Sequence, residues 1–303
     1  MINYIVRNTL LALLVCFTIS CAGDKSASDV QSYTSGIENI LVDESFAPIV
    51  EDQQYVFEST YENAKLRLVL KAENELVNLL MYDTAQVAIM SRTLTDAEQS
   101  HFRAKQIKIR LNRFAVDGIA LIVHKSVKDS TTEVGEIIKI LKGQQSSIDG
   151  LVFDNPNSST VRYFKELADV NTLPEKGIYA LKTNADVIRY VYENPGTVGV
   201  IGVNWMVQPP EDMEKLVGEL KVLGVKNVKG KAGDDGYYKP VQSDIALGLY
   251  PLTRDLYIIN CEGGAGLGTG FASFVAGERG QRIVLKSGLL PDSIPSREIN
   301  IVK

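Results

Sequence analysis

Three segments of the sequence place hydroxyl side chains where a strand is expected to give way to a helix: residues 43–45, 91–93 and 155–160. The free N–H groups and the dipole of a helix N-terminus favour an anion. In an open α/β sheet such turns meet at the carboxyl ends of the strands, where ligands usually bind. Helix capping is the commoner role of any one such turn. Three turns, one of which carries Arg92, together favour an anion-binding site.

Strands and helices alternate along most of the chain. The segment 87–90 is short and wholly apolar, which is typical of a strand buried in a parallel sheet, and residues 95–98 form a capping box that starts a helix. The expected strands are 37–42, 66–70, 87–90, 119–123, 151–153, 198–203, 256–259 and 283–285. The expected helices begin at 45, 73, 95, 132, 158, 185 and 271. This alternation predicts an α/β fold with largely parallel sheets.

The composition is ordinary for a globular protein, with 45% hydrophobic and 23% charged residues among 303. The 32 Lys and Arg residues against 37 Asp and Glu leave a net charge of −5, which argues against nucleic acid as a partner. A single core stops growing at roughly 250–300 residues, so two domains are expected. His101 and His124 are the only histidines, so no metal site, cofactor or catalytic imidazole cluster is predicted.

Residues 1–20 are predicted to be a signal peptide outside the fold. Arg7 is the only charge among the first 23 residues, and the apolar run 10–19 is shorter than the ~20 residues that span a membrane. The small residue before Cys21 resembles the lipobox of bacterial lipoproteins, which implies lipidation of Cys21. The alternative is a plain secretory signal. Small and polar residues predict a flexible tether over 21–35.

Two further features receive a structural interpretation. Cys261 is the only cysteine left after the signal and the lipid site, so we predict a buried thiol at a strand end. The glycine-rich segment 263–270 has Thr269 where GxGxxG needs its third glycine, so a packed turn or flexible connection is favoured over a nucleotide loop. No GxSxG elbow occurs in the sequence. Catalysis is therefore not expected.

Four stretches, in their order and spacing, resemble the PstS-like phosphate-binding proteins, the extracytoplasmic receptors of ABC-type phosphate importers: residues 87–98, 115–123, 157–163 and 280–291. Residues 250–258 are similar to the return strand of that family. The resemblance covers roughly residues 36–302.

The resemblance implies a two-lobed periplasmic-binding-protein fold, type II-like, with one oxyanion between the lobes. Each lobe is a mostly parallel sheet flanked by helices, and two hinge strands join them. Lobe one would be residues 36–116 plus 252–303, and lobe two the inserted residues 117–251. Such receptors close around the ligand by hinge bending.

The resemblance also implies the phosphate ligands, position by position. Ser45 matches the hydroxyl residue at the first helix start, and Ser91 matches the serine of the second binding turn. Residues 157–160 match a Gly-Ser-Gly-Thr-type turn, with Asn157 and Ser159 in place of glycines. The implied phosphate-binding residues are Ser45, Ser91, Arg92, Asn157, Ser158, Ser159 and Thr160.

Two charges are exchanged relative to well-studied members of the family. Arg92 stands where those members have the aspartate that accepts the phosphate proton, and Asp154 stands where they have an arginine. An Arg92–Asp154 pair, with Arg92 binding phosphate, would preserve the pairing. The proton acceptor is then Asp117 or Asp154. Arg162 is either a reserve cation or a solvated arginine.

The expected function is a lipid-anchored, exported receptor that captures inorganic phosphate for a membrane ABC permease. It would act as a monomer at the cell membrane or outer membrane, facing the periplasm or exterior, without catalysis. The alternatives are a receptor for another oxyanion such as sulfate, molybdate or tungstate, and a sensor or scaffold lipoprotein with the same fold.

Overall fold

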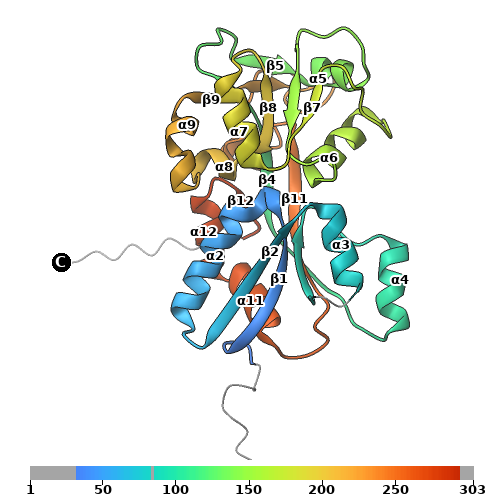
Figure 1. The fold of residues 1–303 in the computed structure, drawn as a ribbon, viewed down its shortest axis with the longest axis vertical. Helices are drawn as coiled ribbons and strands as arrows, with labels where there is room; N and C mark the ends of the chain where they lie inside the picture. The colour runs from blue at the N-terminus through green and yellow to red at the C-terminus, as the bar shows by residue number, and fades with distance from the viewer. Residues whose placement is uncertain (1–31, 83–84, 294–303) are drawn as a thin grey trace, which may run out of the picture. The chain divides into compact units, whose positions relative to one another are not determined.

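A ten-stranded mixed sheet organises residues 32–82 and 85–293, which are the residues that this computed structural model describes (Figure 1). The strands, in chain order, are β1 (Gly36–Asp43), β2 (Ala64–Lys71), β3 (Val87–Met90), β4 (Arg110–His124), β5 (Thr131–Glu133), β6 (Leu151–Phe153), β7 (Ile178–Ala180), β8 (Val198–Gly202), β9 (Leu220–Val222), β10 (Gly224–Lys226), β11 (Thr253–Asn260) and β12 (Leu290–Pro291). The sheet order is β2-β1-β3-β11-β4-β8-β6-β7. Strands β9 and β12 pair with β4, and β5 and β10 form a separate parallel pair.

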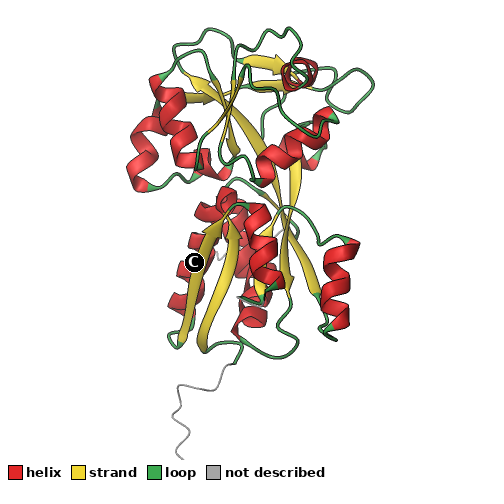
Figure 2. Ribbon diagram, turned by 45° about the vertical axis from the view of Figure 1, so that its right-hand side comes forward, coloured by secondary structure: helices red, strands yellow, loops and turns green. Residues whose placement is uncertain are grey.

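The helices connect these strands and flank the sheet (Figure 2). They are η2 (Glu44–Phe46), α2 (Ala47–Thr60), α3 (Glu73–Met81), α4 (Asp96–Ala104), α5 (Val134–Leu141), α6 (Ser159–Ala168), α7 (Asn184–Glu193), α8 (Asn204–Val207), η3 (Glu211–Met213), α9 (Glu214–Gly218), α10 (Gln242–Ala246), α11 (Leu267–Ala276) and α12 (Glu278–Lys286). The predicted α/β class is confirmed. Within residues 32–82 and 85–293, none of these helices is both long and apolar enough to cross a membrane.

Parallel pairing occurs in two groups of strands. Strands β2, β1 and β3 form one group, and β8, β6 and β7 form the other. Strand β3 is buried along its whole length, as its continuous apolar sequence predicts. Helices pack against these strands in the cores: Phe57 of α2, for example, meets Phe271 and Phe274 of α11 edge to face.

Strands β4 and β11 join the two groups and run antiparallel to each other (Figures 1 and 2). The first part of β4 pairs with β11, and its last residues pair with β8 and β9. Two of the apolar core clusters draw almost all their residues from 40–115 and 256–289, and the other two draw almost all theirs from 119–252. The antiparallel pairing is what makes the sheet mixed, and strand–helix alternation alone did not predict it.

Residues 283–285 are not the predicted strand but lie in helix α12. Gly280, Gln281 and Val284 are the buried residues of this segment, and their spacing is that of one helical face. Arg282 and Glu278 form an i,i+4 ion pair on the exposed side. A short apolar run cannot be assigned to strand or helix by its composition, and here the wider periodicity decides.

Smaller differences concern where elements begin. Ser45 lies in the 3-10 turn η2, so the helix predicted from Ser45 begins at Ala47 as α2. The helix predicted from residue 132 begins at Val134, because residues 131–133 pair with β10 instead. Strand β4 is much longer than the predicted 119–123.

The predicted signal peptide, Cys21 and most of the predicted tether lie outside the described residues. Residues 32–35, the last part of that tether, form a turn in which the Ser32 amide donates to the Ser35 carbonyl at 3.0 Å. This turn packs on α11: a Cβ added at Gly270 would lie 1.8 Å from the Tyr33 carbonyl oxygen. Only glycine allows this close approach. The C-terminal end of the predicted tether is therefore packed against α11.

Candidate functional site

The hydroxyls of two predicted turns meet directly in the structure. Ser45, in η2 after β1, donates from Oγ to Asp154 Oδ2 at 3.2 Å, and its Oγ lies 3.4 Å from Thr160 Oγ1 at the start of α6. Ser158, Ser159 and Thr160 are all buried, as is Ser45. Turns that are more than 100 residues apart in sequence thus form one polar centre.

Asp154 lies at the centre of this polar cluster. Ser158, the N-cap of α6, donates to Asp154 Oδ1 at 2.5 Å and accepts the Val161 amide at 3.2 Å. Asn184 at the start of α7 donates to Asp154 Oδ2 at 3.2 Å. Burial raises the pKa of Asp154, against bonds from Ser158 and Ser45 and the charge of Arg254 that favour its ionised form.

Arg254 is the buried cation of this centre, and the sequence analysis did not identify it. It faces Asp117 across β11 and β4, and its Nε donates to Asp117 Oδ2 at 2.9 Å. Its Nη1 donates to Ser159 Oγ at 2.9 Å and Thr160 Oγ1 at 3.1 Å. The guanidinium lies 4.6 Å from the centre of the Phe46 ring, a cation–π distance. Its Nη2 is buried and has no hydrogen-bond acceptor in the described part of the chain.

The register of the strand was the sequence signal for Arg254. Arg254 shares its alternate positions with Leu252, Leu256 and Ile258, all of which are buried, so its side chain is on the inward side. Only the pairing of β11 with β4 places it opposite Asp117 and beside α6.

Arg92 lies beside different partners from those predicted. Its Nη1 and Nη2 both donate to the Glu98 carboxylate at 2.8 Å, and its Nε is 3.6 Å from Glu73. Glu98 also closes the capping box of α4, and the Arg92 hydrogen bonds lower its pKa to about 2. The predicted Arg92–Asp154 pair is therefore absent among the described residues. The Arg92 guanidinium is paired with Glu98, six residues along the chain, instead.

Arg162 is not the solvated arginine that one of the two predictions described. It contacts Ser91 of the second hydroxyl turn, residues 91–93. Its Nη2 donates to Ser91 Oγ at 2.9 Å, and its Nε donates to Glu73 Oε1 at 2.6 Å. Ser91 Oγ in turn donates to Glu73 Oε2 at 3.2 Å. Glu73, fully buried in the first turn of α3, was not predicted as a site residue. It holds Ser91 and Arg162 together.

Asn157 does not join the site. It is exposed, its amide donates to Asn155 Oδ1 at 2.9 Å, and its carbonyl accepts the Asn74 amide at 3.5 Å. Its role is to shape the turn that leads into Ser158. The remaining implied ligands, Ser45, Ser91, Ser158, Ser159 and Thr160, do lie in or beside the cluster.

Two more carboxyl groups lie at the end of β1, those of the buried Asp43 and the half-buried Glu44. Burial raises the pKa of Asp43 to about 7; neighbouring Glu73 adds to this effect, and Arg254 and Ser159 oppose it. Burial raises the pKa of Glu44 to about 8, against hydrogen bonds from Asn184. Burial also raises the pKa of Asp117, although Arg254 opposes it. Burial thus raises the pKa of each of these carboxyls, and for Asp43 and Glu44 it brings the pKa close to neutral pH.

The backbone around Asp117 and Ser45 is tightly packed. A Cβ at Gly202 would lie 2.5 Å from Asn204 Oδ1 and 3.3 Å from Asp117 Oδ2. At the next turn, Trp205 Nε1 donates to the Ser45 carbonyl at 3.0 Å. Gly202 and Trp205 therefore hold the first hydroxyl turn against β8.

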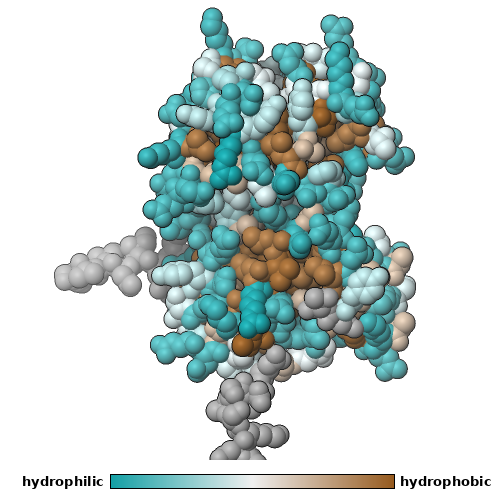
Figure 3. Space-filling model, viewed as in Figure 1, coloured by the Kyte–Doolittle hydropathy of each residue, from teal (hydrophilic) through white to brown (hydrophobic). Residues whose placement is uncertain are grey.

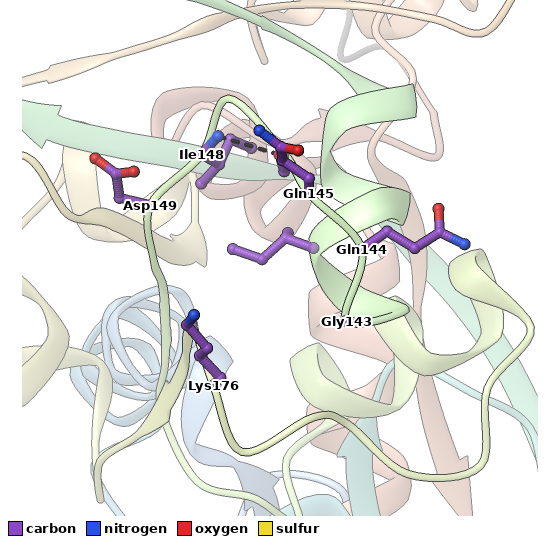
Figure 4. Close-up of a pocket in the computed structure, with 9 residues that line it drawn as sticks. Gly143, Gln144, Gln145, Ile148, Asp149 and Lys176 are labelled. Atoms are coloured by element: carbon purple, nitrogen blue, oxygen red, sulfur yellow. Dashed lines mark hydrogen bonds between the residues drawn. The ribbon is translucent and has the colours of Figure 1, made fainter.

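A cavity of about 200 Å³ opens from the cluster, with Asp43, Glu44, Asp154 and Ser158 among its lining residues. Its outer lining includes Leu70 and Lys71 of β2, an edge strand over which apolar side chains gather in Figure 3. A separate cavity of about 410 Å³ is lined by the loop after α5, which carries Gln144 and Gln145, and by the segment that carries Lys176 (Figure 4). None of the predicted site residues lines that separate cavity.

Two other sequence features carry no ligand chemistry. Glu262 accepts from the amides of Gly268 and Thr269 at the start of α11, so a carboxylate of the chain itself already occupies the anion position of the glycine-rich segment. Cys261 is buried at the end of β11, as predicted. Among residues 32–82 and 85–293, no three His, Cys, Asp or Glu side chains are arranged to hold a metal ion.

Two groups of parallel strands, two joining antiparallel strands and a polar centre at the strand ends define an α/β protein of the class that binds ligands at the carboxyl ends of its strands. Comparison of the sequence with family descriptions agrees: residues 29–279 match the PBP superfamily domain. The chain belongs to the PBP superfamily. The predicted resemblance to PstS-like proteins is confirmed at the level of the fold.

Solved structures show the same fold at low sequence identity. A candidate phosphate ABC transporter substrate-binding protein from Clostridium perfringens, with bound phosphate, matches 85% of this chain and 100% of its own, with a TM-score of 0.69 and 18% identity. An ABC-type phosphate transport receptor from Vibrio cholerae matches 84% of this chain and 100% of its own, with a TM-score of 0.61 and 17% identity. Comparison with curated proteins gives no match.

Proposed function

We propose that the protein is a solute-binding receptor that captures inorganic phosphate for an ABC importer, without catalysis. The observation that carries this proposal is Arg254, whose Nη1 donates to the first turn of α6 while its buried Nη2 has no acceptor among the described residues. A phosphate oxygen at Nη2 would accept a charge-assisted hydrogen bond beside the N-terminus of α6, where the helix dipole favours an anion. The named phosphate-binding structures with this fold support the same ligand.

The buried carboxylates favour phosphate over sulfate. Phosphate keeps a proton at neutral pH, and Asp117 Oδ1, which has no donor among the described residues, is an available acceptor for it. Asp154 is the second candidate. Sulfate has no proton to donate, so a buried carboxylate would face its lone pairs at a desolvation cost.

The remaining parts of the proposal come from the sequence. A signal peptide at 1–20, a lipid on Cys21 and a tether over 21–35 would export the protein as a monomer and anchor it to the cell membrane or outer membrane, beside the permease. Lobe one would be residues 36–116 plus 252–303 and lobe two residues 117–251, with β4 and β11 as the hinge strands. The division of the apolar cores supports these boundaries.

Calorimetry with phosphate, sulfate, molybdate and tungstate tests the proposal. We expect phosphate to bind at least ~100-fold tighter than sulfate, equivalent to about 2.7 kcal/mol. Arg254→Gln should lose at least ~10-fold in phosphate affinity because the charge-assisted bond disappears. Arg113→Gln is the matched control, because Arg113 lies on β4 but is exposed, 47% in its side chain, and pairs with Asp255 and Asp292.

Three results would redirect the assignment. Equal affinity for phosphate and sulfate would indicate a general oxyanion receptor without a proton acceptor. If another oxyanion bound more tightly than phosphate, that oxyanion would be assigned as the ligand. No response to any of the four anions in folded protein would indicate a sensor or scaffold that acts through protein contacts.

A further inference from the structure

A buried carboxylate connects two helices whose apolar faces belong to different cores. Glu73 lies in the first turn of α3, and its side chain is 1% exposed. Leu76 and Leu80 of α3 pack in the core of β1 and β3, whereas Val161 and Phe164 of α6 pack in the core of β4 and β6. The two helices lie beside each other and meet through polar side chains at Glu73 (Figure 1).

Arg162 of α6 supplies the contact from the other side. Its Nε donates to Glu73 Oε1 at 2.6 Å, and its Nη2 donates to Glu73 Oε2 at 3.2 Å and to Ser91 Oγ at 2.9 Å. Ser91 Oγ donates its one proton to Glu73 Oε2 at 3.2 Å. Two N–H groups on two carboxylate oxygens are the strong, bidentate form of an arginine–carboxylate pair.

This ion pair crosses between two parts of the chain. In the described part of the chain, it is the ion pair that connects residues 40–115 with residues 119–252. The hydrogen bond of Ser45 to Asp154 also crosses between them, but it lies within the proposed phosphate site. Hinge motion that separates the two parts, and so releases a ligand held between them, must break the ion pair.

We propose that Glu73 is a positioning residue for phosphate capture: it binds Arg162 beside the Ser91 turn, and this Glu73–Arg162 latch slows the separation of α3 and α6 through which phosphate leaves. The inference rests on the proposed function and adds the residue that sets the rate of release. Loss of partly buried, charge-assisted hydrogen bonds should speed release about 10-fold, since differences in affinity arise mostly in the dissociation rate. Glu73 acts through Arg162 and Ser91, not through contact with the ligand.

Two variants of opposite charge distinguish a latch from a direct electrostatic effect on the anion. Release of radiolabelled phosphate after a chase with excess unlabelled phosphate would be measured for wild type, Glu73→Gln and Arg162→Gln. We expect about 10-fold faster release from both variants, with association rates within about 3-fold of the wild type. Charge alone would slow release in Glu73→Gln, which removes a negative charge, and speed it in Arg162→Gln. Slower or unchanged release from folded Glu73→Gln would overturn the latch.

Glu166→Gln is the matched control. Glu166 pairs with Nη1 of the same guanidinium at 3.0 Å, but it lies on α6 itself and its side chain is 63% exposed. The variant removes one ion pair of Arg162 and leaves the contact with Glu73 in place, so release should stay within about 2-fold of the wild type. Equal acceleration by Glu166→Gln and Glu73→Gln would overturn the role of Glu73.

A second measurement needs no ligand. Trp205, the only tryptophan of the chain, is buried, and its Nε1 donates to the Ser45 carbonyl across the same two parts at 3.0 Å. Separation of the parts breaks this bond and exposes the indole. In protein without phosphate, acrylamide should quench Trp205 at least ~2-fold more strongly in Glu73→Gln and Arg162→Gln than in wild type or Glu166→Gln. Unchanged quenching in both variants would overturn the latch.

Circular dichroism checks the fold of each variant. If Glu73→Gln does not fold, Arg162→Lys replaces it: lysine keeps the charge but not the bidentate contact, so faster release is still expected, and unchanged release would overturn the latch. If wild-type protein binds no phosphate, the proposed function is wrong, and the quenching comparison by itself decides whether Glu73 and Arg162 hold α3 and α6 together.

Discussion

Arg254 on β11 and Asp117 on β4 face each other in the antiparallel ladder and form a buried ion pair, with Nε and Oδ2 2.9 Å apart. Their side chains are 3% and 0% exposed. The pair joins the two strands that link the two groups of parallel strands, and the same guanidinium reaches the first turn of α6. A single residue thus links the strand ladder to the polar centre.

Breaking this pair should cost stability as well as binding. Arg254→Ala leaves Asp117 as an uncompensated buried charge, which we expect to lower the free energy of unfolding by about 3–5 kcal/mol. The double variant Arg254→Met with Asp117→Leu should recover much of that loss, because an apolar pair can replace a buried ion pair. Urea unfolding measures both. A single variant as stable as the wild type would contradict the buried-pair interpretation.

Arg92 should contribute less to phosphate binding than Arg254 does. Its guanidinium is neutralised by Glu98 and is close to Glu73. We expect Arg92→Ala to weaken phosphate binding by less than ~3-fold, because little of the Arg92 charge is free to act on the ligand. Calorimetric titration of Arg92→Ala beside Arg254→Gln decides the point. A larger loss of phosphate affinity for Arg92→Ala would show that Arg92 contributes to phosphate binding.

Ser158 and Asn157, adjacent residues before α6, should differ in their contribution to stability. Ser158→Ala removes the N-cap of α6 and a donor to buried Asp154, and should lower the free energy of unfolding by about 1–2 kcal/mol. Asn157→Ala changes an exposed side chain and should stay within about 0.5 kcal/mol of the wild type. Urea denaturation compares the two. Equal losses of unfolding free energy in the two variants would mean that capping by Ser158 does not stabilise the protein.

Stability should fall as pH rises from about 4 to 8. Asp43 and Glu44 have folded-state pKa values raised to about 7 and about 8, so the folded state holds more protons than the unfolded chain in this range. Their contribution is fully present below their unfolded pKa values of about 4 and is lost as pH rises through the raised ones. Thermal unfolding at pH 5, 6, 7 and 8 should show the decline, and Asp43→Asn should flatten it. A pH-independent midpoint would show that both carboxylates are solvated.

Substitution of Cys21 tests the proposed membrane anchoring. If the cysteine carries lipid, full-length wild-type protein expressed in a bacterial host should partition into the detergent phase, and Cys21→Ser should give unprocessed or aqueous protein. Detergent phase partitioning measures the difference. If both proteins partitioned equally into the aqueous phase, Cys21 would not carry a lipid.

Local signals in the sequence were sufficient to predict most individual elements. The apolar run of β3, the capping box at Thr95 and the serines that start α6 each depend on neighbours within a few residues, so they can be recognised without a fold. Residues 283–285 were the exception, because three apolar residues fit a strand or one helical face equally well.

The sequence by itself also determined which turns hold hydroxyls, since residue type and helix start are local properties. The tertiary structure decided which charges meet them. Arg254 reaches α6 only because β11 pairs with β4, and Glu73 reaches Ser91 and Arg162 only because α3 and α6 lie beside one turn. Arg92 was assigned to the site by its position in the chain, but Glu98 is nearer and engages it. Ion pairs form between the nearest suitable partners in space, and for Arg254 and Glu73 the packing of strands and helices, rather than sequence spacing, sets those distances.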